Sequence, residues 1–164
     1  MPWQMMISTL IRKARGFARR SRFEQAWFVP AWLLLGAGRL LILAVPFRSL
    51  AGHLGMRAGI APWAPLINAR REAKALAISR VIRMAARYTP WTSNCFVQAV
   101  AARVLLGIHG IPYCLFFGVG RDPGAELQAH AWVVSGRVQV SGGESFDKFT
   151  VVGCFAAPEL AVDQ

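Results

Sequence analysis

Acidic residues are scarce in this sequence. Only eight of its 164 residues are Asp or Glu, against nineteen Lys and Arg, so the formal net charge is +11. Residues 1–90 carry fifteen basic and two acidic side chains, whereas the remainder is slightly acidic. This excess favours partners with negative charge, such as acidic peptides, acidic protein surfaces, nucleic acid or anionic lipid. Charge alone does not choose among them.

Cysteines are also few, and they form no CxxC pair. Cys95, Cys114 and Cys154 make an odd number, which argues against a secreted disulfide scaffold and against a structural zinc site. The three histidines show no metal-ligand spacing with them. The sequence therefore predicts a reducing, cytoplasmic setting and gives no reason to expect a metal or a cofactor.

A signal peptide with an A-x-A cleavage site is missing as well. The apolar run 26–45 is about as long as a membrane span, but it contains Pro30, two glycines and Arg39. A charge inside a bilayer is costly and proline disturbs a helix. We expect a helix that is buried or faces a partner, while contact with a membrane surface stays open.

The first half of the chain reads as helical. Apolar residues recur at helical spacing in 7–18, opposite a basic face. Ser21 and Glu24 fit a capping box for a second helix that Pro46 would end. A shorter helix is predicted over 47–56, a connection over 59–65, and a further helix with a core face at 78–85 that ends near Tyr88.

The pattern changes after Pro90. Residues 92–94 are all plausible caps for a helix beginning at about Cys95. Strands are predicted over 111–119, 127–134, 137–140 and 149–152, with turns at 121–124, at Ser135-Gly136 and at Gly142-Gly143. Helices followed by an antiparallel sheet indicate an α+β fold. We divide the chain into a basic, apolar helical region (1–88) and a core that carries the chemistry (89–164).

Cys95 is the strongest candidate for a functional residue. In the first turn of a helix, a thiolate is stabilised by the macrodipole and by backbone N–H groups. The same groups can bind the oxyanion of an acyl-transfer intermediate. A small core cysteine is the competing interpretation. Cys114 and Cys154 lie in strand-like apolar segments and are interpreted as packing residues.

His130 is the candidate base. It lies within a predicted strand in Q-A-H-A-W, between small alanines that leave room for a partner side chain. Cysteine on a helix followed by histidine on a strand fits a thiolate–imidazolium pair, although a core histidine is an equal alternative. His53 and His109 are interpreted as surface or capping residues.

A third residue should orient the imidazole of His130. The candidates are Gln139 and Ser141 on the return strand, and Glu144 and Asp147 beyond the double glycine. Asp147 is slightly preferred because it is acidic and lies among phenylalanines. Each of the four could equally be a plain polar residue.

At these residues the chain resembles the lasso-peptide B2 proteins, which are transglutaminase-like leader peptidases. The likeness is firm over about 88–155 and looser before that, and it rests on W-T-S-N-C at 91–95, H-G-I-P at 109–112 with the strand 115–120, A-H-A-W at 129–132, and G-G at 142–143 with F-T at 149–150.

This resemblance implies a transglutaminase- or papain-like core, with the nucleophile at a helix N-terminus packed on an antiparallel sheet. It implies that Cys95 and His130 cleave a precursor peptide between leader and core, with an acidic third residue. Some relatives have Asp where this chain has the segment V-S-G-G, 140–143. A different residue, or a backbone carbonyl, would then orient His130.

The resemblance also implies partners: the precursor peptide, a small leader-recognition protein and an ATP-dependent cyclase. The chain is too short to include its own recognition domain, so it resembles the split form. Two other functions stay open, namely transglutaminase-type acyl transfer and a non-catalytic basic module that binds a membrane or a partner. Nucleic acid is not expected, because few aromatic residues alternate with the basic ones.

Overall fold

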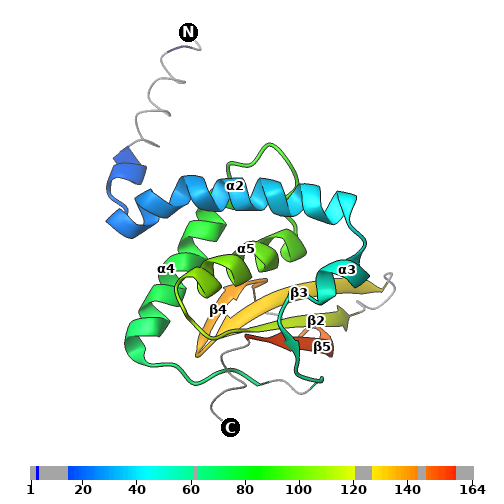
Figure 1. The fold of residues 1–164 in the computed structure, drawn as a ribbon. Helices are drawn as coiled ribbons and strands as arrows, with labels where there is room; N and C mark the ends of the chain where they lie inside the picture. The colour runs from blue at the N-terminus through cyan, green and yellow to red at the C-terminus, as the bar shows by residue number, and fades with distance from the viewer. Residues whose placement is uncertain (1–2, 4–14, 61–62, 121–126, 144–146, 158–164) are drawn as a thin grey trace.

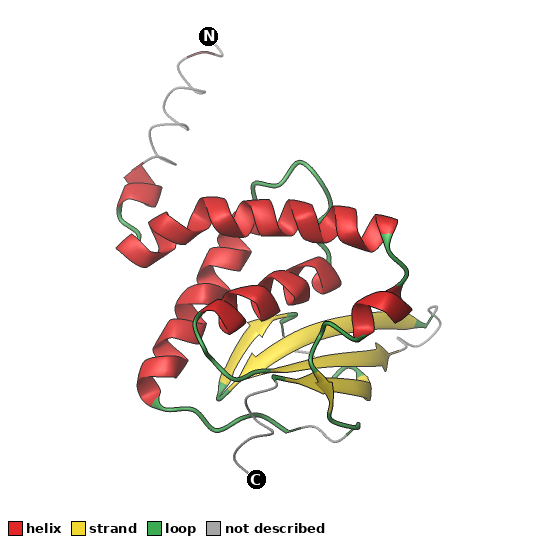
Figure 2. Ribbon diagram, in the orientation of Figure 1, coloured by secondary structure: helices red, strands yellow, loops and turns green. Residues whose placement is uncertain are grey.

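The computed structural model describes residues 3, 15–60, 63–120, 127–143 and 147–157. Helices lie on one side of a sheet, as Figures 1 and 2 show. The helices are α2 (Arg22–Ala44), α3 (Phe47–Ala51), α4 (Ala69–Ala86) and α5 (Cys95–Ile108). The strands are β1 (Met56–Arg57), β2 (Cys114–Gly120), β3 (Gln128–Ser135), β4 (Val138–Ser141) and β5 (Thr150–Ala156).

The five described strands form one antiparallel sheet in the order β1-β5-β2-β3-β4. β4 is therefore an edge strand. It ends opposite the middle of β3, because Ser141 pairs with Val133. The half of β3 that carries His130 extends past this end. The mixed helix and antiparallel sheet expected from the sequence is confirmed.

The helix starts follow the predicted caps. Ser21 Oγ accepts from the Glu24 N–H at 3.2 Å, and the Glu24 carboxylate accepts from the Ser21 N–H at 3.2 Å, so α2 begins with the expected capping box. α2 ends at Ala44, two residues before Pro46. Buried Ile78 and Ile82 confirm the predicted core face of α4.

Several local predictions need correction or fall outside the described residues. The helix expected over 47–56 ends at Ala51, because Met56 and Arg57 pair with β5 instead. The hairpin turn lies at 136–137, one residue later than expected, and β5 is longer than the strand expected over 149–152. Most of 7–18 and all of 121–124 lie outside the described residues, although 15–18 is helical.

The main core lies between the helices and one face of the sheet. Ala131 and Val133 of β3 contribute to it, together with buried residues from α2, α4 and α5. A smaller cluster covers the opposite face, where Phe116, Trp132 and Cys154 meet. Since side chains alternate along a strand, His130 shares its face with Trp132 and not with Ala131.

α2 supports the segment that leads to Cys95. The Trp32 indole N–H donates to the Tyr88 carbonyl at 3.1 Å, and the Trp32 and Trp91 rings lie 4.7 Å apart. A Cβ at Gly36 would lie 2.9 Å from the Trp91 ring, so glycine permits this close packing. The helical region is thus packed directly against the entry to α5.

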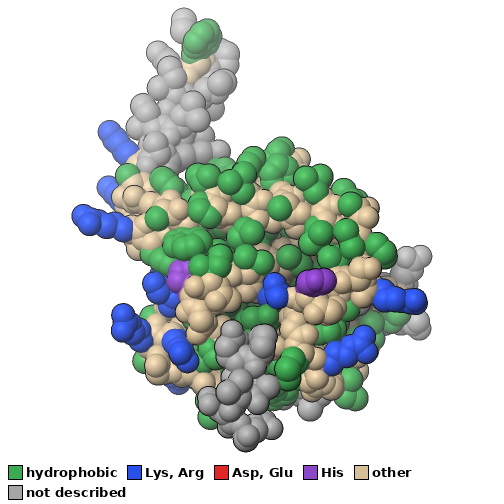
Figure 3. All heavy atoms as spheres, in the orientation of Figure 1, with side chains coloured by type: hydrophobic (Ala, Val, Ile, Leu, Met, Phe, Trp, Pro, Cys, Tyr) green, Lys and Arg blue, Asp and Glu red, His purple; other side chains and the backbone are tan. Residues whose placement is uncertain are grey.

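The outer side of α2 is apolar and exposed. Leu33, Leu40 and Leu43 are more than half exposed, and Figure 3 shows hydrophobic side chains along this helix. By length and composition α2 could cross a membrane, a test that soluble core helices also pass. Only 17% of its most apolar window is buried. The helix is therefore not buried over most of this surface, and the expected contact with a partner stays a prediction.

Candidate active site

Cys95 is the first residue of α5. Asn94 caps this helix: its side chain accepts from the Val97 N–H at 3.0 Å, and its carbonyl accepts from the Gln98 N–H at 3.0 Å. The predicted helix start is confirmed, with Asn94 as the cap. The half-buried thiol consequently lies at the positive end of the helix dipole.

The loop before Cys95 is held by its own polar groups. Thr89 Oγ1 lies 3.0 Å from the carbonyls of Ala86 and Trp91 and 3.0 Å from the Ser93 hydroxyl. The side-chain amide of Gln98 donates to the Ser93 carbonyl at 2.8 Å. These bonds tie the loop to the end of α4 and to the first turn of α5, which fixes the position of the thiol.

The imidazole of His130 is held from two sides. It stacks on Phe149 with ring centroids 4.6 Å apart, and its Nε2 lies 2.8 Å from the Gly142 carbonyl oxygen. A carbonyl can only accept, so Nε2 carries a hydrogen and Nδ1 is left as the basic nitrogen. This tautomer can take a proton from a thiol.

A cavity of about 360 Å³ brings the two candidates together. It lies between α4, the start of α5 and the end of β4. It is lined by Ser79, Arg83, Ser93, Asn94, Cys95, Gln98, His130, Gln139, Val140, Ser141, Gly142 and Gly143. Within the described part of the chain, no hydrogen bond joins the Cys95 thiol to the imidazole. Cys95 lines the cavity from the helical layer, and His130 lines it from β3, on which its side chain shares the face of Trp132.

The candidates for a third residue occupy different places. Gln139 and Ser141 line the cavity, but Ser141 Oγ is buried without a hydrogen-bond partner and does not bind the imidazole. Asp147 is exposed and does not line the cavity. Glu144 lies outside the described residues. The group that meets His130 is the Gly142 carbonyl, in line with the backbone alternative.

The remaining histidines and cysteines pack as the sequence indicated. Cys114 and Cys154 are buried on the Trp132 face of the sheet. A hydrogen bond to Cys154, together with burial, raises the pKa of the Cys114 thiol. His109 forms the C-cap of α5, and its ring lies against Trp27, whereas His53 is exposed.

Three residues that line the cavity were not anticipated from the sequence, namely Gln98 of α5 and two residues of α4. Ser79 and Arg83 come from α4, which reads as a plain core helix in the sequence. Ser79 is buried and its hydroxyl donates to the Gln139 carbonyl at 3.4 Å. A serine at the core-facing position next to Ile78 was the only available signal.

A family model described as the transglutaminase-like superfamily matches residues 41–154. The chain belongs to the transglutaminase-like superfamily. The match contains both Cys95 and His130, and it starts within α2, before the domain boundary expected at residue 88. That boundary stays a prediction. The superfamily includes cysteine peptidases and acyltransferases, and its domain is usually a cysteine-based catalyst. Searches of curated proteins and of solved structures found no match.

Proposed function

We propose that this transglutaminase-like protein is a cysteine peptidase that removes the leader from a ribosomally made lasso-peptide precursor. The observation that carries the proposal is the shared cavity of Cys95, at the start of α5, and His130, whose Nε2 is anchored by Gly142. The superfamily makes cysteine-dependent chemistry the natural use of such a cavity. The lasso-peptide substrate comes from the sequence resemblance.

In the first half of the reaction, Nδ1 of His130 takes the proton of the Cys95 thiol. The thiolate attacks the carbonyl carbon that joins leader to core. The asparagine cap uses the N–H groups of Val97 and Gln98, so the N–H of Cys95 is available to the oxyanion. The C–N bond then breaks, and the imidazolium gives its proton to the departing amine of the core.

In the second half, water hydrolyses the thioester. His130 takes a proton from the water as its oxygen attacks the carbonyl, and the C–S bond breaks. The leader leaves with a new carboxylate, and the thiol is restored. In the imidazolium state the Gly142 carbonyl accepts the Nε2 hydrogen and keeps the ring in place. It replaces the acidic residue that such sites commonly have.

The proposal includes the partners that the resemblance implies. A small recognition protein would present the leader, and an ATP-dependent cyclase would take the freed core. The exposed leucines of α2 are available for contact with a protein or a membrane surface. We expect the protein to work in the cytoplasm.

Mass spectrometry of a lasso-peptide precursor tests the proposal. We expect leader and core from the wild type with its recognition protein, and a rate at least about 10³-fold lower with Cys95→Ala. Circular dichroism and leader-complex binding should be unchanged in the variant. Retained cleavage by Cys95→Ala would exclude the mechanism.

Acyl transfer to an amine is the second candidate, because the superfamily includes acyltransferases. The product masses separate the two reactions. Hydrolysis adds one water across the cleaved bond, whereas cross-linking through a glutamine side chain releases ammonia. If neither product forms and binding to a partner weakens as salt is added, a non-catalytic basic module is favoured instead.

A further inference from the structure

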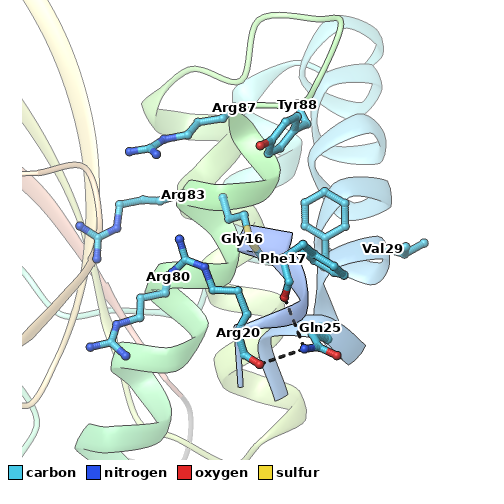
Figure 4. Close-up of a pocket in the computed structure, with 11 residues that line it drawn as sticks. Gly16, Phe17, Arg20, Gln25, Val29, Arg80, Arg83, Arg87 and Tyr88 are labelled. Carbon is cyan, nitrogen blue, oxygen red and sulfur yellow. Dashed lines mark hydrogen bonds between the residues drawn. The ribbon is translucent and has the colours of Figure 1, made fainter. Parts of the chain in front are cut away.

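A second and larger cavity lies on the other side of Arg83. Its volume is about 800 Å³, and it lies between residues 16–20, the first turns of α2 and the second half of α4. Figure 4 shows the side chains around it. They are Gly16, Phe17, Arg20, Gln25, Phe28, Val29, Arg80, Arg83, Met84, Arg87 and Tyr88.

Four arginines give this cavity a strong positive charge. Arg80 and Arg83 lie on α4 and Arg87 is its C-cap, so the three are spaced three and four residues apart and share one face. Figure 4 shows them extending toward the same side, with Arg20 nearby. Among the described residues, the ion pair is that of Glu72 with Arg137. None of the four arginines therefore forms an ion pair with a described carboxylate.

The opposite wall is aromatic. The Phe17 and Phe28 rings meet edge to face at 5.4 Å, and Phe28 meets Tyr88 in the same way at 6.0 Å. Phe17 and Tyr88 are exposed to solvent. A ligand in this cavity would therefore meet guanidinium groups on one side and aromatic rings on the other.

Arg83 connects this cavity to the candidate active site. It lines both cavities, so the two hollows adjoin the same side chain of α4. A ligand that extends from the larger cavity past Arg83 arrives at Cys95 and His130. Because Arg83 adjoins both cavities, the site favours an extended ligand, such as a peptide, with one end at the Cys95 thiol.

We propose that the larger cavity binds an acidic segment of the peptide substrate, away from the bond that is cleaved. Carboxylates would pair with Arg20, Arg80 and Arg87, and an apolar side chain would lie on Phe17 and Phe28. Arg80 to Arg87 spans about 10 Å of helix, which matches roughly three residues of extended peptide. This inference rests on the proposed peptidase function. It adds that the peptide substrate carries an acidic segment.

An acidic peptide fits the site better than a lipid surface does. Arg83 lines both this cavity and that of Cys95 and His130, and a flat membrane could not extend from one hollow into the other. The exposed leucines of α2 would be the natural contact for a membrane. Peptide and lipid are therefore expected to depend on different residues.

Fluorescence anisotropy with a labelled decapeptide tests the inference. One peptide carries three Glu around a Phe, and its match carries three Gln. We expect the wild type to bind the Glu peptide at least about tenfold more tightly, and the double variant Arg80→Glu with Arg87→Glu to lose that preference. Arg70→Glu, an equal charge change at an exposed position early in α4, should retain it.

Equal binding of the two peptides by the wild type would overturn the inference, as would an equal loss in the Arg70→Glu control. Binding to phosphatidylglycerol vesicles tests whether the cavity binds lipid instead of peptide. If the double variant loses vesicle binding while neither peptide binds, the cavity is a lipid site and the inference is wrong. Melting temperatures of all variants show whether they are folded.

The outcome is separable from that of the peptidase proposal. Cys95→Ala should bind the Glu peptide as the wild type does, since binding does not need the thiol. If the wild type cleaves no precursor, the proposed function fails whether or not the Glu peptide binds. If the wild type cleaves a precursor with Glu and its Gln counterpart at the same rate, the function stands and the acidic-segment inference fails.

Discussion

Gly142 has a backbone conformation and a close neighbour that both require glycine, and its carbonyl binds His130. Its φ is +90°, and a Cβ there would lie 2.3 Å from the Cβ of Trp132. Its carbonyl is the acceptor for His130 Nε2. Any side chain at this position would move the backbone that orients the imidazole.

We therefore expect Gly142→Ala to lose about 2–4 kcal/mol of unfolding free energy and most of the activity. Gly143→Ala is the matched control, because Gly143 has a positive φ of 64° but open space around its Cβ position. It should lose only about 1–2 kcal/mol. Urea unfolding measures both values. Equal losses in the two variants would show that contact with Trp132 is not the decisive constraint.

The sequence singled out Cys95 and His130, which line one cavity, because their residue types and their places in predicted elements carried information. The group that binds the His130 imidazole could not be predicted in the same way. A backbone carbonyl has no residue type, and only the double glycine marked an unusual backbone at 142–143. Asp147 attracted attention by its charge, yet it is exposed and lies outside the cavity lining.

At the scale of elements, one ion pair joins the helical layer to the β3–β4 hairpin. The Glu72 carboxylate accepts from the Arg137 side chain at 3.2 Å and from its backbone N–H at 3.1 Å. These hydrogen bonds lower the pKa of Glu72 below its ordinary value of 4.5. They hold the start of α4 against the turn after β3.

The sign of the pH effect follows from that direction. A folded-state pKa below the unfolded value stabilises the protein above about pH 4.5, and the contribution is lost as the pH falls through the folded value. Glu72→Gln should therefore lower the melting temperature at pH 7, and the difference from wild type should shrink by pH 3. A difference that stays constant from pH 7 to pH 3 would show that the charge of Glu72 has no part in it. Arg70→Gln is the control and should match wild type at both values.

Helix starts were predictable because a cap is a local signal. Ser21 with Glu24, and Asn94 before Cys95, specify their helices within four residues. Strand limits were less accurate, because they depend on distant partners. β1 exists only through pairing with β5, about a hundred residues later, and β5 extends to Ala156 because β2 pairs with it along its length.

At the scale of the whole molecule, the basic first half and the second half form one packed unit. α2 packs on the segment before Cys95, and α4 contributes Ser79 and Arg83 to the cavity that Cys95 and His130 line. The excess of positive charge in the first half gathers in part as the arginines of the larger cavity. The sequence showed the charge, but only the folded chain shows that it adjoins the cavity of Cys95 and His130.

The central claim is that this packing lets His130 activate Cys95. Cys114 and Cys154 are buried, so alkylation of the folded protein by iodoacetamide reports on Cys95. Intact-protein mass spectrometry at pH 7 should show alkylation of the wild type at least about tenfold faster than of His130→Ala, because the variant lacks the base that takes the thiol proton. Asp147→Asn should react as the wild type does. Equal rates for wild type and His130→Ala would contradict the account.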